Sequence, residues 1–449
     1  MLAGIPDGAR YDVAVLGAGA AGMAATIYAA LESRRVILIE RTEYVGGTSA
    51  FSAATTWVPN THHSKAIGAE DSFEKASGYL DRAVGNRSSK TIRDAFLKAG
   101  PDAIRIIEDG AGVKFRPRPF HPDYLSELEG STSFGRALEP LPFSAKGLGS
   151  DLDLIRPPIP EFTILGGLMV DRDDIANLLA MTKSLKAARY SAKLIGGYFL
   201  DRLSHSRGTR LVMGNALIGR MLQAARRLGV EIAVNTRVTE ITESEGRVTG
   251  IVAIQDGVVR RLSISGGVVL ASGGFARHPE LRQKYLPKPV PEHSPSAPGH
   301  TGELHDLALK LGAHHGEGAQ QNCFWAPVSV RWRADGTTAV FPHFVFDRSK
   351  PGIITVGRDG KRFVNESTSY HLFVSAMFAA DRDGSTIPAY LIADSAGLKK
   401  YGLGMARPGG RGLRPFLPDG YISPRPIRLL NWRKSSASTP AGWRHRSHR

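Results

Sequence analysis

A glycine-rich turn between a short apolar strand and a helix of small residues is the feature of this chain that most restricts its fold. Residues 11–16 (YDVAVL) predict a buried strand, residues 17–22 (GAGAAG) form a G-x-G-x-x-G turn, and residues 24–31 continue as a helix. A second apolar strand over residues 36–39 ends at Glu40, 18 positions after the last glycine of the turn. This order of strand, turn, helix, strand and acid is typical of a βαβ unit that binds a dinucleotide.

Each glycine of this turn has its own steric role. Gly17 permits the tight turn, Gly19 lets the backbone approach a pyrophosphate, and Gly22 allows the helix to pack closely on the strand. The N-terminus of the helix faces the phosphates, and an acid at the position of Glu40 binds the ribose hydroxyls. We therefore expect these residues and Ala21 to contact the dinucleotide.

The segment after Glu40 favours FAD over NAD as the dinucleotide. Residues 46–49 (GGTS) supply a Gly-Gly pair and two hydroxyls shortly after the ribose acid. Their backbone amides and hydroxyls can follow an extended flavin past its pyrophosphate, whereas NAD proteins need no such loop. The candidate contacts from this segment are Arg41, Gly46, Gly47, Thr48 and Ser49.

Two further strands are expected to complete the cofactor site. Residues 230–238 predict a strand suited to contact an adenine edge, and residues 267–275 predict a strand that closes on a Gly-Gly turn. The candidate contacts from these strands are Val238, Ala271, Ser272 and Gly273.

Taken together and in this order, these elements resemble the flavoprotein family of fumarate reductase and 3-oxosteroid 1-dehydrogenase. Residues 46–59 (GGTSAFSAATTWVP) resemble its flavin-contacting segment, although Ala53 and Ala54 replace a Gly-Gly pair. Residues 324–327 (FWAP) and 361–366 (KRFVNE) resemble its inserted substrate domain. The resemblance implies an α/β fold, with a Rossmann-like FAD-binding domain and an inserted α+β substrate (capping) domain.

The expected domain boundaries follow from this resemblance. Residues 1–280 are expected to form the FAD-binding domain, with a mostly helical excursion over about residues 65–205, and residues 281–420 the substrate domain. Alternating apolar residues in 231–234, 247–254 and 261–264 predict a small β-meander beside the core.

The segment around Tyr124 favours the ketosteroid branch of the family. Residues 121–124 (HPDY), followed by Gly135 and Arg136, resemble that branch, in which a tyrosine lies near the substrate, and the His-Pro-Thr signature of fumarate reductases is absent. The implied activity is α,β-dehydrogenation of a hydrophobic, 3-ketosteroid-like ketone, with the hydride passing to flavin N5. We expect Tyr124 to be catalytic, because a tyrosine can act as base or donor in an apolar pocket, and Tyr370 to be the second candidate.

The C-terminal residues depart from the family. Residues 431–449 contain no acid and no apolar periodicity, where family members continue with an acid-rich helix. We expect a shift of reading frame between about residues 421 and 431, so that residues 421–449 form a non-native basic tail and the returning segment of the FAD domain is missing. Two alternatives therefore stay open: an enoate or fumarate-type flavin reductase, and a truncated, non-catalytic remnant that retains only a dinucleotide fold.

Composition restricts the partners and the compartment. The formal net charge is +16, but residues 404–449 carry 10 basic residues and 1 acid with no aromatic stacking platform, so we expect no nucleic-acid partner. Cys323 is the single cysteine, which excludes an intrachain disulfide and fits the cytoplasm. No apolar run is long enough to span a bilayer, and the apolar but lysine-rich residues 178–203 allow at most a peripheral membrane contact. The sequence does not identify the electron acceptor.

Other charged residues carry weaker signals. The pairs His62-His63 and His314-His315 have no acid or cysteine at metal-ligand spacing, so we expect no metal site. Arg348, next to Asp347, is expected to form a solvated ion pair.

Overall fold

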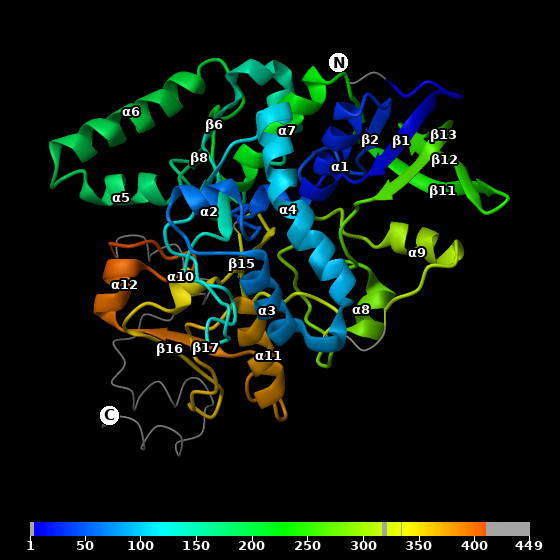
Figure 1. The fold of residues 1–449 in the computed structure, drawn as a ribbon. Helices are drawn as coiled ribbons and strands as arrows, with labels where there is room; N and C mark the ends of the chain where they lie inside the picture. The colour runs from blue at the N-terminus through cyan, green and yellow to red at the C-terminus, as the bar shows by residue number, and fades with distance from the viewer. Residues whose placement is uncertain (1–3, 317–320, 334, 410–449) are drawn as a thin grey trace. The chain divides into compact units, whose positions relative to one another are not determined.

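A computed structural model describes residues 4–316, 321–333 and 335–409 (Figure 1). The described residues belong to two compact units, one from Met1–Pro279 with Ser296–Ala319 and one from Glu280–Pro295 with Gln320–Arg449. Among the described residues, 296–316, expected in the substrate domain, fall in the first unit. That the second unit binds substrate stays a prediction, and the predicted basic tail, residues 421–449, lies outside the described residues.

The first unit contains a six-stranded sheet with the strand order β10-β2-β1-β13-β12-β11, the largest sheet among the described residues (Figure 1). β2, β10 and β13 extend from β1 as a parallel half, and β12 and β11 continue it as an antiparallel half. The strands are β1 (Arg10–Leu16), β2 (Val36–Ile39), β10 (Glu231–Ala233), β11 (Thr236–Ser244), β12 (Arg247–Gln255) and β13 (Val258–Leu270).

Both faces of the parallel half are covered, which explains why all four residues of β2 are apolar and buried. Val15 and Leu38 face one apolar cluster, together with residues of α1 (Ala20–Leu31), α4 (Lys90–Ala111) and α7 (Met213–Arg227). Leu16 and Ile37 belong to a second cluster that includes residues of β11, β12 and β13. The α/β fold expected from the glycine-rich unit is confirmed.

The expected meander differs from the structure at its first strand. β10 pairs in parallel with β2, so residues 231–233 belong to the parallel half instead of the meander. The single strand expected over residues 230–238 is in fact two, because Asn235, at φ 51°, turns the chain between β10 and β11. β13 belongs to both halves of the sheet, because it pairs in parallel with β1 and antiparallel with β12. Val269 pairs with Val15 of β1, and Ser263 pairs with Gly250 of β12.

A largely helical excursion separates β2 from β10. Its helices are α2 (His62–Ala66), α3 (Phe73–Val84), α4, α5 (Arg172–Ala180), α6 (Leu185–Asp201) and α7, with short 3-10 turns η1 (Gly47–Phe51), η2 (Gly85–Arg87), η3 (Ala145–Leu154) and η4 (Pro160–Phe162). Its short strands are β3 (Thr56–Trp57), β4 (Phe115–Pro117), β5 (Ala137–Pro140), β6 (Phe143–Ser144), β7 (Thr163–Ile164), β8 (Leu168–Met169) and β9 (Arg210–Leu211). No helix among the described residues is long and apolar enough to cross a bilayer.

The second unit contains two antiparallel strand pairs and several helices. β14 (Val328–Trp332) pairs with β15 (Thr338–Pro342), and β16 (Ile353–Val356) pairs with β17 (Tyr390–Ala393). The helices are α8, whose bounds are Pro279–Tyr285, α10 (Val345–Arg348), α11 (Tyr370–Ala380) and α12 (Ser395–Tyr401), while α9 (Glu303–Lys310) lies in the first unit.

Arg348 is buried inside the second unit, where it donates to backbone carbonyls, so the expectation of a solvated ion pair was wrong. Its side chain is fully buried, and its guanidinium donates to the backbone carbonyls of His343 and Glu366 at 3.2 and 2.9 Å. The guanidinium also lies 4.2 Å from the ring centroid of Phe373. Burial lowers the pKa of Arg348 to about 10.

Candidate functional site

A cavity of about 400 Å³ lies in the first unit where β1, β2 and β13 end. Leu16, Ile39 and Leu270, the last residues of these strands, all line it. Ligands of open parallel sheets bind at this edge, outside the carboxyl ends of the strands. Twelve of the fourteen predicted cofactor contacts line the cavity: Gly17, Gly19, Ala21, Glu40, Arg41, Gly47, Thr48, Ser49, Val238, Ala271, Ser272 and Gly273.

The other two predicted contacts, Gly22 and Gly46, are not among the lining residues. A Cβ on Gly22 would lie 1.8 Å from the carbonyl oxygen of Gly17, so only glycine lets α1 pack this closely behind the turn. Gly46 has φ 109°, and a Cβ there would lie 2.8 Å from that of Ala50. Neither glycine lines the cavity, but each allows the segments that form its wall to pack closely.

Glu40 organises the cavity wall as well as lining it. The side chain is buried, and its Oε2 accepts the Ala18 N–H at 3.0 Å. Its Oε1 accepts both the N–H and the hydroxyl of Thr42 at 2.9 Å. A carboxylate accepts about four hydrogen bonds, so about one acceptor position is left for a ligand hydroxyl.

The hydroxyls of Thr48 and Ser49 attach the loop at η1 to its neighbours. Ser49 Oγ accepts the N–H of Ala20, in the first turn of α1, at 3.2 Å. Thr48 Oγ1 accepts the N–H of Ala297 at 2.9 Å and lies 3.0 Å from Nε2 of His300. Segments that are far apart in sequence thus meet at one wall of the cavity.

His300 is a lining residue that the sequence analysis did not select. Burial lowers the pKa of His300, and the positive charges of Arg277 and Arg156 lower it further, while Glu40 acts in the opposite direction. The imidazole therefore faces the cavity in its neutral form near neutral pH. A Cβ on Gly273, at φ 78°, would lie 2.5 Å from this ring, so only glycine fits beside it.

Arg156 is a second lining residue that the sequence did not reveal, because its Arg-Pro-Pro context reads only as a linker. It is 5% exposed, and its Nη2 donates to Thr42 Oγ1 at 2.6 Å. The guanidinium lies 5.4 Å from the ring centroid of Tyr44, and its Nε is buried and has no hydrogen-bond partner in the described part of the chain. Burial lowers the pKa of Arg156. A buried cation with spare donors on a cavity wall suits an anionic ligand.

Two arginines that line the cavity both form ion pairs with the same glutamate. Glu303, the first residue of α9, lies 3.1 Å from Nη1 of Arg41 and 3.1 Å from Nε of Arg237. All three residues line the cavity. These half-exposed ion pairs contribute little to stability, but they hold two cations beside the site.

The two predicted catalytic tyrosines lie in different units. Tyr124, in the first unit, is 45% exposed and follows Asp123, whose carboxylate accepts from Trp57 Nε1 and from Arg136 Nη1, each at 2.7 Å. Tyr370 begins α11 in the second unit, with its ring centroid 5.5 Å from that of Phe324. Their catalytic role stays a prediction.

The structure brings an acid to the His62-His63 pair from a distant part of the sequence. Glu108, 45 positions after His63, lies beside the His62-His63 pair, and the potential ligand atoms of these residues are all within 4.8 Å of one another. Spacing along the sequence could not show this, because α2 and α4 meet only in the folded chain.

Comparison with known proteins places this architecture in a family. A family model described as "FAD binding domain" matches residues 12–420. A 4-oxocyclohex-2-ene-1-carboxylate 5-dehydrogenase of Sinomonas cyclohexanicum is 34% identical, over 92% of this chain and 70% of that protein. A 3-oxosteroid 1-dehydrogenase of Mycolicibacterium smegmatis is 31% identical, over 92% of this chain and 73% of that protein. The crystal structure of a 3-ketosteroid delta1-dehydrogenase from Sterolibacterium denitrificans, in complex with 1,4-androstadiene-3,17-dione, superposes with a TM-score of 0.78 and 30% identity, covering 91% of this chain and 72% of that one.

Proposed function

The chain belongs to the FAD-binding family of flavin-dependent dehydrogenases, and from that premise we propose that it dehydrogenates a small hydrophobic cyclic ketone at the carbons α and β to the carbonyl. The relatives named above are dehydrogenases whose names specify a six-membered oxo ring or an oxosteroid. A cyclic ketone is the substrate feature that these names share.

The residues present fit the cofactor. The glycine turn leaves the N-terminus of α1 open to the cavity, and a Cβ on Gly19 would meet only Ser49 Oγ, at 3.8 Å, so a ligand can approach the backbone there. Arg156 supplies a buried positive charge for a pyrophosphate, and Glu40 retains an acceptor for a ribose hydroxyl. When bound, FAD supplies a hydride acceptor.

Tyr124 is the residue that we assign to proton handling. The reaction removes a proton from the carbon beside the carbonyl, so a base or a hydrogen-bond donor must lie at the substrate. This assignment is supported by the ordered turn before Tyr124, where Asp123 and Asp71 both accept from Arg136, whose side chain is 1% exposed.

The single observation that supports the proposal most strongly is the convergence of the glycine turn, Glu40, the η1 loop and the end of β13 on one cavity. The test is to incubate FAD-loaded protein with an artificial electron-accepting dye and either 4-androstene-3,17-dione or 4-oxocyclohexanecarboxylate. We expect dye reduction with at least one ketone, and a product lighter by two hydrogens in mass spectrometry.

Two results would contradict the proposal. One is protein that holds FAD but reduces the dye with neither ketone. The other is dye-reduced protein that instead consumes an unsaturated acid such as fumarate, which would support the enoate-reductase alternative.

A further inference from the structure

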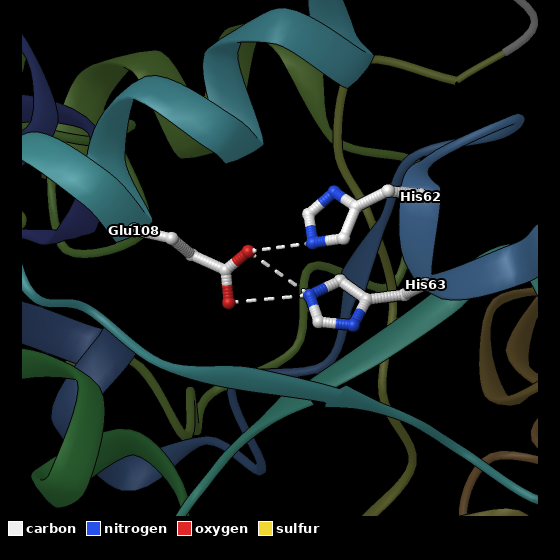
Figure 2. Close-up of side chains that lie close together, drawn as sticks. All are labelled: His62, His63 and Glu108. Atoms are coloured by element: carbon white, nitrogen blue, oxygen red, sulfur yellow. Dashed lines mark hydrogen bonds and ion pairs between the residues drawn. The ribbon is translucent and has the colours of Figure 1, made fainter. Parts of the chain in front are cut away.

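Two adjacent histidines and a glutamate from another helix converge on one point of the first unit (Figure 2). Nε2 of His62 lies 3.1 Å from Oε2 of Glu108, and Nε2 of His63 lies 3.0 Å from the same oxygen. The histidines begin α2, and Glu108 lies near the end of α4. Figure 2 shows both rings turned toward the carboxylate.

The carboxylate of Glu108 is buried and is paired with two imidazoles. The side chain of Glu108 is 7% exposed, and a buried carboxylate is costly unless it is paired or binds a metal. Among the described residues, its ion-pair partners are the two imidazoles, with no lysine or arginine.

The surrounding contacts fix the donor atoms in place. Glu108 Oε1 accepts the N–H of Phe115 at 3.1 Å and lies 3.2 Å from Nε2 of His63, so the orientation of the carboxylate is fixed by the backbone as well as by the rings. The Nδ1 of His62 is buried with no hydrogen-bond partner among the described residues, so its ring depends on Nε2 for its orientation. The Nε2 side of the cluster is therefore where a ligand would act.

We propose that His62, His63 and Glu108 bind a divalent transition-metal ion of the zinc class. Two imidazole nitrogens and one carboxylate oxygen are a donor set that such ions take, and Mg²⁺ or Ca²⁺ would require oxygen ligands instead. The separations of 3.0 and 3.1 Å are close to those of donors that are each about 2.0–2.1 Å from one ion. The side chain of His62 is 39% exposed, so water can occupy the remaining coordination position.

The ion joins α2 to α4. Ser64, also in α2, donates to the carbonyl oxygen of Gly135 at 2.5 Å, so α2 already anchors a segment of the first unit. The cluster is not among the lining residues of the 400 Å³ cavity, so this site is separate from the FAD site and does not rest on the proposed function.

Zinc binding to the intact FAD-loaded protein, freed of metal with a chelator, tests the proposal. We expect one equivalent of Zn²⁺ to bind in calorimetry, unaffected by excess Mg²⁺, with X-ray absorption showing two imidazoles at about 2.0–2.1 Å. His63→Asn and Glu108→Gln should each weaken binding by more than the roughly 10- to 100-fold that loss of an outer-shell partner causes. His205→Asn, outside the cluster, is the matched control and should bind zinc like the unaltered protein.

Three results would overturn the site: absence of a one-equivalent zinc step, equal zinc affinity in the unaltered protein and His63→Asn, or an equal loss in His205→Asn. Because Glu108→Gln alters a buried group, circular dichroism must show that this variant is folded. His62→Asn changes a half-exposed side chain and repeats the test without that risk.

Discussion

Replacing Arg156 by methionine is expected to weaken FAD binding without destabilising the apoprotein. Arg156 lines the cavity and is 5% exposed, and its buried Nε has no hydrogen-bond partner among residues 4–316, 321–333 and 335–409. In the apoprotein its charge is buried with few partners, which lowers the pKa of its guanidinium. With FAD bound, the same guanidinium can donate to the anionic pyrophosphate.

The magnitude follows from the number of bonds at stake. A hydrogen bond to a charged group contributes about 1.5–3 kcal/mol, so losing one such bond raises the dissociation constant of FAD roughly 10- to 150-fold. In the apoprotein, losing the bond from Arg156 to Thr42 costs about 1 kcal/mol, but removing a buried charge offsets it. The free energy of unfolding should therefore change by no more than about 1 kcal/mol.

The assay is fluorescence titration of apoprotein with FAD, alongside urea unfolding of the apoprotein. Arg105→Met is the matched control, because Arg105 is half-exposed on α4 and pairs only locally with Asp102. An Arg156→Met protein that binds FAD within about threefold of the unaltered protein would refute the role of this guanidinium.

Three further substitutions test other parts of the site. Gly22→Ala should lower the free energy of unfolding, measured by urea denaturation, by about 3 kcal/mol or more, because the new Cβ would lie 1.8 Å from the Gly17 carbonyl oxygen. The control Gly196→Ala, with open space around its Cβ, should not destabilise the protein. Burial lowers the pKa of His300 in the folded protein, so as the pH falls below about 6.5 the unfolded chain binds a proton before the folded chain does, and the free energy of unfolding decreases. His300→Gln should reduce this dependence of the free energy of unfolding on pH by at most about 1.4 kcal/mol per pH unit. An unchanged pH dependence in urea unfolding would contradict this prediction. Tyr124→Phe should lower the rate of ketone dehydrogenation about 10²- to 10⁴-fold with an unchanged flavin spectrum, and an unaltered rate would remove Tyr124 from the chemistry.

The part of the cavity wall that the sequence marks most clearly is the part that is local in sequence. The turn, its helix and the η1 loop lie within residues 17–51, and glycines with defined backbone demands mark them. Gly17 has φ 109°, and a Cβ there would lie 2.5 Å from the Ala271 carbonyl oxygen. Such a steric requirement leaves a pattern that a single sequence can show.

The residues that the sequence did not reveal are those brought in by distant segments. Arg156 and His300 reach the cavity from about 115 and 250 positions beyond Thr42 and Thr48, and no local pattern marks either of them. Glu108 meets the His62-His63 pair in the same way. Arg348 was misjudged because its neighbour Asp347 suggested an ion pair, whereas its carbonyl partners lie up to 20 positions away.

The charges around the cavity explain how the chain can hold the site ready before FAD binds. Three lining arginines would repel one another, but Glu303 lies between Arg41 and Arg237 at 3.1 Å from each, and Arg156 lies on the side of Glu40, bridged to it by Thr42. These five lining residues carry a net charge of +1, which is too small to disrupt the fold and of the right sign for a pyrophosphate. Because the carboxylates are held by backbone and side-chain partners, the cations need little rearrangement when the ligand arrives. The cavity thus presents an arrangement of charges that suits an anionic pyrophosphate beside the glycine turn.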